Sequence, residues 1–299
     1  MSAPRRQALE IQARLRPSRN LVGHVMRLSR ANPVGVLGLI LVVFFVATAV
    51  TAPIVAPQLP EAVFRQQILK PPSGEFMLGT DHLGRDVLSR TIYGTRISLL
   101  VGFAVALAGV SVGTIVGITS AYVGGILDMA VQRVVDVLMS IPGLILALAL
   151  MAALGQSLQN VILALVVGQI PSTVRVIRSV TLGIIQNQYI EAARAIGAPG
   201  WWIVLRHVAP NAVPPILVVA SILPGGAIVA ESSLSFLGLG VPADVPTWGS
   251  MLGGSVQRFA TSAPWIVVFP GLALSLTVFG INLFGDALRD VLDPRMRGR

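Results

Sequence analysis

The sequence predicts an all-α polytopic membrane protein with six transmembrane helices, on three observations. Hydrophobic residues make up 54% of the 299 positions and charged residues only 12%, whereas a soluble domain carries about 25% charged residues. Long stretches of the chain contain no charged side chain, and a charge at the centre of a bilayer costs several kcal/mol. These stretches are continuous, unlike the alternating segments of about ten residues that form a membrane β-barrel.

Six stretches are long enough to cross a bilayer, since a helix needs about 20 residues to do so. The expected helices are 34–56, 97–123, 137–154, 158–177, 210–233 and 263–286. The third and fourth come from one uncharged run, which the polar patch GQSLQN at 155–160 divides. The fourth is short and contains Pro171.

The distribution of Lys and Arg predicts the orientation of these helices. With a cytoplasmic N-terminus, 16 of the 22 basic residues lie in cytoplasmic segments, as the positive-inside rule requires. Basic residues before the first helix then serve as an orientation signal and contact anionic lipid, rather than nucleic acid. The expected organisation is a cytoplasmic tail at 1–33, a first helix at 34–56, an extracytoplasmic loop at 57–96, a transmembrane core at 97–286 and a cytoplasmic tail at 287–299.

The extracytoplasmic loop combines Asp81, His82 and Asp86, which could suggest a metal site. No further ligand type is close in the sequence, so we expect no metal there. The simpler interpretation is that Asp86 or Ser89 caps a helix. Two basic residues are then expected to anchor the chain at the membrane interface, Arg90 and Arg96.

The remaining polar residues of the core form no catalytic constellation. The sequence has no GxSxG motif, no phosphate-binding loop with Lys and Ser/Thr, and no cysteine. Glu231 ends an apolar run, so it is either a functional acid within the membrane or a helix-end acid that pairs at the water interface. Asp128, Arg133 and Asp136 are expected to form a solvated turn between the second and third helices.

A stripe of glycines in the second expected helix indicates close helix packing. Gly109, Gly113 and Gly117 recur at four-residue spacing, which places them on one helix face. Packing within the chain is the simpler interpretation, and a subunit interface is the alternative.

The segment YIEAARAIGAPGWWIVLRHVAPN, at 189–211, is expected in the cytoplasm between the fourth and fifth helices. Residues 188–197 predict a short helix, with Glu191 in its first turn and Gly197 at its end. Pro199 should start a second short helix, which Pro210 closes.

This segment has two physical interpretations. Its small residues, Ala192, Ala193 and Ala195, would let the helix lie deep in a groove of a partner protein. Alternatively, the segment is an interfacial amphipathic helix, with Trp201 and Trp202 among the lipid headgroups. The residues alone leave both open.

The same segment resembles the EAA loop of ABC-transporter permease subunits. The matching positions are Glu191, Ala192, Ala193, Gly197 and Pro210. The family's usual Ile-Leu-Pro is here Val208-Ala209-Pro210, which is a conservative change. LGTDHLGRDVLSRTIYGTRISLLVG, ESSLSFLGLGVPADVPTWGSML and NLFGDALRDVLDPRMR are similar to segments of the C-type subunits of dipeptide and oligopeptide permeases. The resemblance covers the chain from about residue 20 onward.

The resemblance implies a type I importer permease fold in the bacterial inner membrane. It implies a transport subunit that is not an enzyme and holds no cofactor, with ATP bound by two cytoplasmic ATPase subunits, each engaging one EAA loop at 187–210. It also implies a B-type permease partner and an extracytoplasmic binding protein that delivers a dipeptide or oligopeptide. A nickel complex or glutathione is the alternative substrate. A proton-coupled secondary transporter that uses Glu231 would need paired intramembrane charges and an internal repeat, and neither is visible in the sequence.

Overall fold

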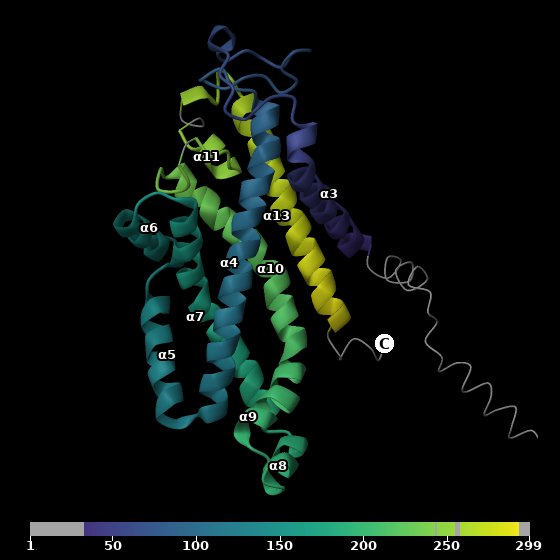
Figure 1. Ribbon diagram of the computed structural model, residues 1–299, viewed down its shortest axis with the longest axis vertical. Coiled ribbons are helices and arrows are strands. Elements are labelled where there is room, and N and C mark those ends of the chain that lie inside the picture. Colours follow the sequence, from purple (N-terminus) through teal and green to yellow (C-terminus); the bar gives the residue numbers. More distant parts are fainter. Residues whose placement is uncertain (1–32, 243, 255–257, 293–299) are drawn as a thin grey trace, which may run out of the picture.

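The computed structural model describes residues 33–242, 244–254 and 258–292, which form an elongated bundle of helices (Figure 1). The described elements are α3 (Pro33–Val55), η1 (Arg65–Gln67), α4 (Val87–Val123), α5 (Gly125–Ser140), α6 (Gly143–Leu154), α7 (Leu158–Ile185), α8 (Gln188–Ala195), α9 (Gly200–Ile203), η2 (Val204–Val208), α10 (Ala209–Phe236), α11 (Trp248–Leu252) and α13 (Trp265–Leu292). The expected tails lie outside the described residues, except for Pro33 and 287–292, which belong to helices.

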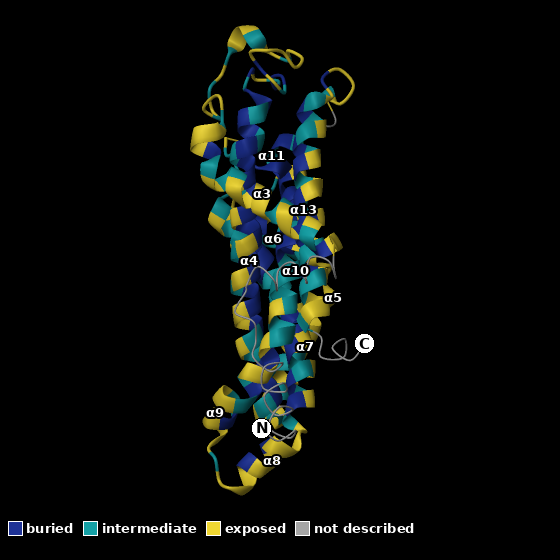
Figure 2. Cartoon of the chain, turned by 90° about the vertical axis from the view of Figure 1, so that its right-hand side faces the viewer, coloured by how far each residue is buried: buried dark blue, intermediate teal, exposed yellow. Residues whose placement is uncertain are grey.

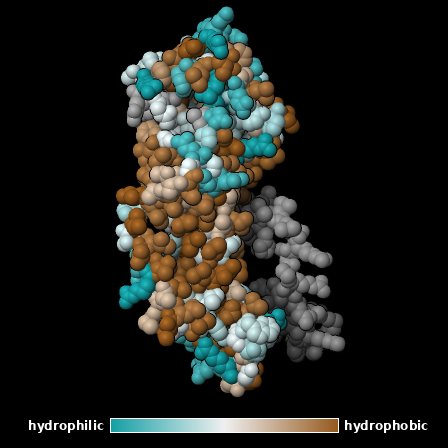
Figure 3. Space-filling view, turned by 60° about the vertical axis from the view of Figure 1, so that its left-hand side comes forward, coloured by the Kyte–Doolittle hydropathy of each residue, from teal (hydrophilic) through white to brown (hydrophobic). Residues whose placement is uncertain are grey.

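Five described helices are long and apolar enough to cross a membrane, and they include five of the six expected spans. Helices α5 and α6, bent by 88° relative to each other, add a sixth if the two together make one crossing. Hydrophobic atoms cover the middle of the molecule in Figure 3, whereas hydrophilic atoms gather towards its two ends. Exposed residues cover much of the outside of the bundle in Figure 2. Many of them are apolar, such as Ile40 and Phe44 in α3. This surface suits a lipid or protein environment rather than water.

The glycine stripe of α4 packs against α7 within the chain, as the simpler interpretation predicted. A Cβ atom on Gly113 would lie 2.6 Å from Cβ of Thr173, and one on Gly117 would lie 2.9 Å from the carbonyl oxygen of Val174. Neither position has room for a side chain. The two helices therefore approach closely because the residues at their crossing are small.

A second close crossing joins the first and last described spans. A Cβ atom on Gly38 of α3 would lie 2.8 Å from the carbonyl oxygen of Gly280 in α13, and one on Gly280 would lie 2.7 Å from Cβ of Leu41. The two helices run side by side in Figure 1. This contact holds the N-terminal span against the C-terminal one.

Several expected boundaries are wrong, because charged residues continue the helices. The helix expected at 97–123 begins at Val87, so the loop before it ends at Asp86 rather than at residue 96. The fourth and fifth helices extend to Ile185 and Phe236, and the sixth extends to Leu292. An uncharged stretch marks the apolar part of a helix, but the helix itself continues where its charged side chains find partners or water.

The expected helix at 137–154 and the solvated turn before it are both wrong. Asp128 and Asp136 lie within α5, where they form ion pairs with α7: Arg178 binds both carboxylate oxygens of Asp128 at 2.7 and 2.6 Å, and Arg175 binds Asp136 at 2.6 Å. The sharp bend comes two residues before α6, where Ile141 is extended ahead of Pro142.

Candidate functional site

Residues 188–203, within the segment that is expected in the cytoplasm, form a helical hairpin of α8 and α9 at one end of the bundle (Figure 1). Helix α8 ends where Gly197 adopts φ +79°, a left-handed conformation that favours glycine. The N–H of Ala198 donates to the carbonyl oxygen of Ala193 at 3.1 Å, and that of Gly197 donates to Arg194 at 2.9 Å. These bonds complete a glycine-dependent helix end, so the predicted role of Gly197 as a helix terminator is confirmed.

The hairpin has one buried face and one exposed face. Ile190 and Ala193 pack into a cluster with Ile203 of α9 and with residues of α4 and α7. Glu191 and Ala192 are exposed. The expectation that Ala193 belongs to a low-relief outer surface is therefore wrong, because this methyl group lies against the bundle.

The second short helix does not end at Pro210. Helix α9 passes into the π-helix η2 and then into α10, and the whole run from Gly200 to Phe236 is one helix of 37 residues. The N–H of Ala209 donates to the carbonyl oxygen of Val204, five residues earlier. Proline usually breaks a helix because it lacks an N–H and its ring meets the preceding turn. The wider π turn precedes Pro210 and accommodates it.

The two tryptophans of the hairpin have different surroundings. The Trp202 ring meets His207 edge-on at 5.0 Å between ring centroids and keeps 36% of its surface exposed. Trp201 keeps 67% of its surface exposed, and Leu205, four residues later, keeps 65%. Trp201 is therefore available to a partner or to lipid.

Tyr122 of α4, which the sequence did not indicate as a functional residue, contacts the hairpin. The guanidinium of Arg194 lies 5.7 Å above the ring of Tyr122. A Cβ atom on Gly200 would lie 3.2 Å from the same ring. Tyr122 comes at the last turn of an apolar helix, and nothing in its local sequence indicates this contact.

Glu231 is completely buried near the end of α10, so it pairs inside the protein rather than with water. Its Oε1 atom accepts hydrogen bonds from Ser235 at 2.8 Å and from Thr247 at 2.9 Å. Thr247 is also the N-cap of α11. The carboxyl group thus connects α10 to the short helix α11 of the following loop.

Helix α11 fits tightly against the bundle. A Cβ atom on Gly249 would lie 2.5 Å from Cα of Ser232. Trp248 is fully buried, and its Nε1 donates to the carbonyl oxygen of Thr91 at 3.2 Å. Helix α11 therefore covers Glu231 and its two hydroxyl partners, Ser235 and Thr247, towards the end of the bundle opposite α8 (Figure 1).

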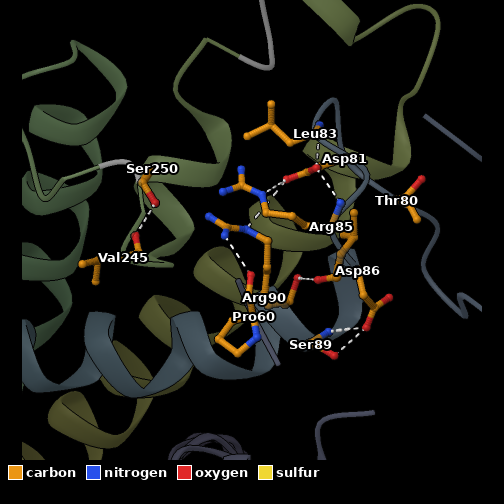
Figure 4. A network of polar contacts seen from close by, with 12 residues as sticks. Pro60, Thr80, Asp81, Leu83, Arg85, Asp86, Ser89, Arg90, Val245 and Ser250 are labelled. Atoms are coloured by element: carbon orange, nitrogen blue, oxygen red, sulfur yellow. Dashed lines mark hydrogen bonds and ion pairs between the residues drawn. The ribbon is translucent and has the colours of Figure 1, made fainter. Parts of the chain in front are cut away.

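Asp86 and Arg90, in and after the loop before α4, have structural partners. Asp86 caps α4 and accepts the N–H of Ser89 at 2.9 Å, which confirms the predicted cap. Arg90 is only 2% exposed and donates to the carbonyl oxygen of Pro60 at 3.1 Å (Figure 4), so its expected role as an interfacial anchor is wrong.

Burial lowers the pKa of His82, whose ring stacks on Phe259 with 5.5 Å between the ring centroids.

Comparisons with known proteins agree with this geometry. Residues 109–298 match the family described as "Binding-protein-dependent transport system inner membrane component", and residues 22–72 match "N-terminal TM domain of oligopeptide transport permease C". The methionine ABC transporter MetNI, in an inward-facing conformation, contains a chain with the same fold. The TM-score is 0.58 at 22% identity, over 68% of this chain and 96% of that one.

Three curated relatives are similar over most of the chain. The dipeptide transport system permease protein DppC of Alkalihalophilus pseudofirmus is 39% identical, over 90% of this chain and 88% of its own length. A putative peptide transport system permease protein of Brucella suis is 40% identical, over 87% and 88%. The glutathione transport system permease protein GsiD of Pectobacterium atrosepticum is 43% identical, over 76% and 75%. The chain therefore belongs to the family of binding-protein-dependent transport system inner membrane components and is a multi-pass protein of the inner membrane.

Proposed function

We propose that this chain is the C-type permease subunit of an ATP-driven importer of dipeptides or oligopeptides. The family and the helical bundle support a transport role. Two of the relatives described above are named for dipeptide or peptide transport. In this proposal ATP is bound by partner subunits, and the permease needs no cofactor of its own.

The coupling site in this proposal is the hairpin of α8 and α9, at 187–210. Its exposed residues Glu191 and Ala192, with Trp201, would contact a cytoplasmic ATPase subunit. Ala193 and Gly197 would hold the hairpin in shape, and Pro210 would sit where the hairpin joins the membrane. This proposal places α8, and with it both termini, in the cytoplasm.

One observation carries the coupling proposal. The helix that begins in the hairpin at Gly200 continues to Phe236, and it includes Glu231. The run stays helical although it includes Pro214, Pro215 and Pro224, and its contacts with α4 and α13 connect a displacement of one end to the rest of the bundle. An ATPase that moves the hairpin would therefore move α10 as a lever, as alternating access requires.

Two further partners follow from the same proposal. Helix α5 leaves most of its apolar side chains exposed, among them Ile126, Met129 and Val137. We assign the exposed apolar face of α5 to contact with a B-type permease subunit, and the edges of this face to contact with membrane lipid. An extracytoplasmic binding protein would deliver the peptide to the end of the bundle that carries α11.

The coupling proposal is tested by Glu191→Lys and Gly197→Asp in the assembled transporter. We expect both variants to lose copurification of the ATPase subunit and peptide-stimulated ATP hydrolysis. Gln186→Lys is the matched control, because Gln186 is exposed at the end of α7 and lies outside the motif. Unchanged copurification and uptake in both variants would show that the hairpin does not couple to the ATPase.

Glutathione is the second candidate substrate, because the relative GsiD is named for its transport. Competition assays separate the two candidates. Uptake of a labelled dipeptide that an excess of glutathione abolishes, and an excess of another dipeptide does not, would favour glutathione.

A further inference from the structure

One face of α10 forms the floor of a groove that three neighbouring cavities make together. Their volumes are about 380, 520 and 240 Å³. The first and second cavities share Val218 and Val219, and the second and third share Gly226 and Val229. Because each cavity shares lining residues with the next, we treat them as one groove, which we call the α10 groove.

The α10 groove is about as long as a bilayer is thick. Its lining begins at Asn211, in the first turn of α10, and ends at Ser233, in the last turn. At a rise of about 1.5 Å per residue, α10 covers about 33 Å between these residues, and the hydrocarbon core of a bilayer measures about 30 Å. Helices α6 and α7 supply the rest of the lining near α11, and α13 supplies most of it near the hairpin.

Two amide side chains line the α10 groove inside membrane-spanning helices, Gln169 of α7 and Asn282 of α13. Among the described residues, neither side-chain amide has a hydrogen-bond partner. Gly225 makes room for one of them, since a Cβ atom there would lie 3.3 Å from Oδ1 of Asn282. An amide that faced hydrocarbon would lose its hydrogen bonds with water at a cost in free energy. The two amides therefore favour a groove that holds water or a polar ligand.

The rest of the lining is almost uncharged. Among the described lining residues, Arg289 is the one with a charged side chain, and it lies at the hairpin end. Asp286 and Asp290 belong to the same helix but are not among the residues that line the groove. Most other lining residues are aliphatic, glycine or proline. Such a wall has no charge that would select one peptide side chain, whereas an amide can both donate to and accept from a peptide bond.

We propose that the α10 groove is this subunit's wall of the peptide pathway, and that Gln169 and Asn282 form hydrogen bonds with the backbone of the peptide. Neutral amides bind the group that all peptides share, so peptides with different side chains can use the same wall. The inference rests on the proposed import of peptides. It also gives the coupling a direct consequence, because the helix that the hairpin would move is the helix that lines the pathway.

The first test places a large side chain in the groove. Gly226 is exposed, and nothing lies within 4 Å of a Cβ atom there. Gly183 of α7 is equally open but does not line the groove, so Gly183→Trp is the matched control. We expect Gly226→Trp to reduce uptake of labelled Ala-Ala by the complete transporter about tenfold, since a pathway is limited by its width. Gly226→Ala and Gly183→Trp should retain uptake, and all three variants should retain their partner subunits.

Two results of this test would overturn the inference. Unchanged uptake in Gly226→Trp would show that the groove faces lipid. Loss of the B-type subunit from the purified Gly226→Trp transporter would show that the groove is a subunit interface.

Thiol labelling tests the groove without filling it. The chain has no cysteine, so mass spectrometry of this subunit reports an introduced thiol alone. Val229 lines the groove and Leu276 of α13 does not, although both side chains are 44% exposed. A charged methanethiosulfonate should modify Val229→Cys about tenfold faster than Leu276→Cys in nanodiscs, because a thiol reacts as the thiolate, which forms in water. Equally slow modification would overturn the inference.

The role of the two amides is tested by a ratio of uptake rates. Ala-Ala and its ester analogue alanyl-lactate differ by one peptide N–H. Gln169→Leu and Asn282→Leu should each lower uptake of Ala-Ala about threefold more than uptake of the ester, as the loss of one neutral hydrogen bond predicts. Gln159→Leu is the control, because Gln159 is an exposed amide of α7 outside the groove. An unchanged ratio in both variants would overturn the role of the amides.

Failure of the proposed function has a different signature. A wild-type transporter that imports no peptide, although Val229→Cys reacts faster than Leu276→Cys, would contradict peptide import and leave a water-lined pathway for another substrate. Import of Ala-Ala by Gly226→Trp at the wild-type rate would contradict only the groove.

Discussion

The two ends of this bundle use polar residues in opposite ways. At the α8 end, Glu191 and Trp201 are exposed on a short hairpin that packs on the bundle through one apolar face. At the α11 end, Glu231, Thr247 and Arg90 are buried and bonded within the chain. The hairpin thus leaves polar and aromatic groups free for the partner of the proposed function, whereas the opposite end uses its polar groups for internal contacts and encloses a cavity.

Two glycines with the same backbone angle provide the strongest test of this comparison. Gly84, at the α11 end, and Gly197, in the hairpin, both have φ +79°. A Cβ atom on Gly84 would lie 2.3 Å from the carbonyl oxygen of Phe64, whereas nothing lies within 4 Å of one on Gly197. We expect Gly84→Ala to lower the free energy of unfolding by about 3 kcal/mol and Gly197→Ala by about 1 kcal/mol. Denaturant unfolding of the purified protein measures both, and equal losses would contradict the comparison.

Replacement of the buried acid should have the next largest effect. Glu231→Ala leaves the hydroxyls of Ser235 and Thr247 without their acceptor, so the free energy of unfolding should fall by about 2–3 kcal/mol. Glu231→Gln keeps an acceptor oxygen and should lose less than half of that. The measurement is unfolding in detergent, together with uptake.

The control for Glu231 is the exposed acid of the hairpin. Glu191→Ala should change the unfolding free energy by less than about 0.5 kcal/mol, although it weakens ATPase binding. If Glu191→Ala destabilises the chain more than Glu231→Ala does, the contrast between the two ends is wrong.

The adjacent tryptophans sharpen the comparison within the hairpin. Trp201→Ala should reduce ATPase binding with almost no loss of stability, because its ring is largely exposed. Trp202→Ala removes the contact with His207 and should cost about 1 kcal/mol. Thermal unfolding and ATPase copurification separate the two effects. A loss of binding in the Trp202 variant alone would reverse their assignment.

A small pH effect is expected at the α11 end. The pKa of His82 is lowered by burial, so the unfolded chain binds more protons than the folded chain below the ordinary pKa of histidine, about 6.5. The stability of this loop should therefore fall as the pH drops through that value. Hydrogen exchange at pH 5.5 and 7.5 measures it in the wild type and in His82→Gln. A wild-type loop that gains protection at the lower pH would contradict the assignment.

The positions of the apolar helices were predicted correctly where the need to be apolar within the membrane is the dominant constraint. The glycine stripe of α4 and the helix end at Gly197 were also predictable, because both depend on local residue types. The ends of spans were not, since a charge count cannot show that Arg178 meets Asp128 across two helices. The prediction that Pro210 ends the second short helix failed for a related reason, because the π turn before it lets the helix continue.

The sequence by itself determined the class of protein, five of its spans and the family, because hydropathy and short motifs are local properties of the chain. Tertiary structure decided which polar residues lie inside. Glu231 and Arg90 look like interfacial residues in the sequence, yet Glu231 accepts the hydroxyl of Thr247 and Arg90 donates to the carbonyl oxygen of Pro60, both from other segments. The α10 groove likewise exists only because α6, α7 and α13 lie beside that helix, and long-range contacts of this kind leave no local pattern.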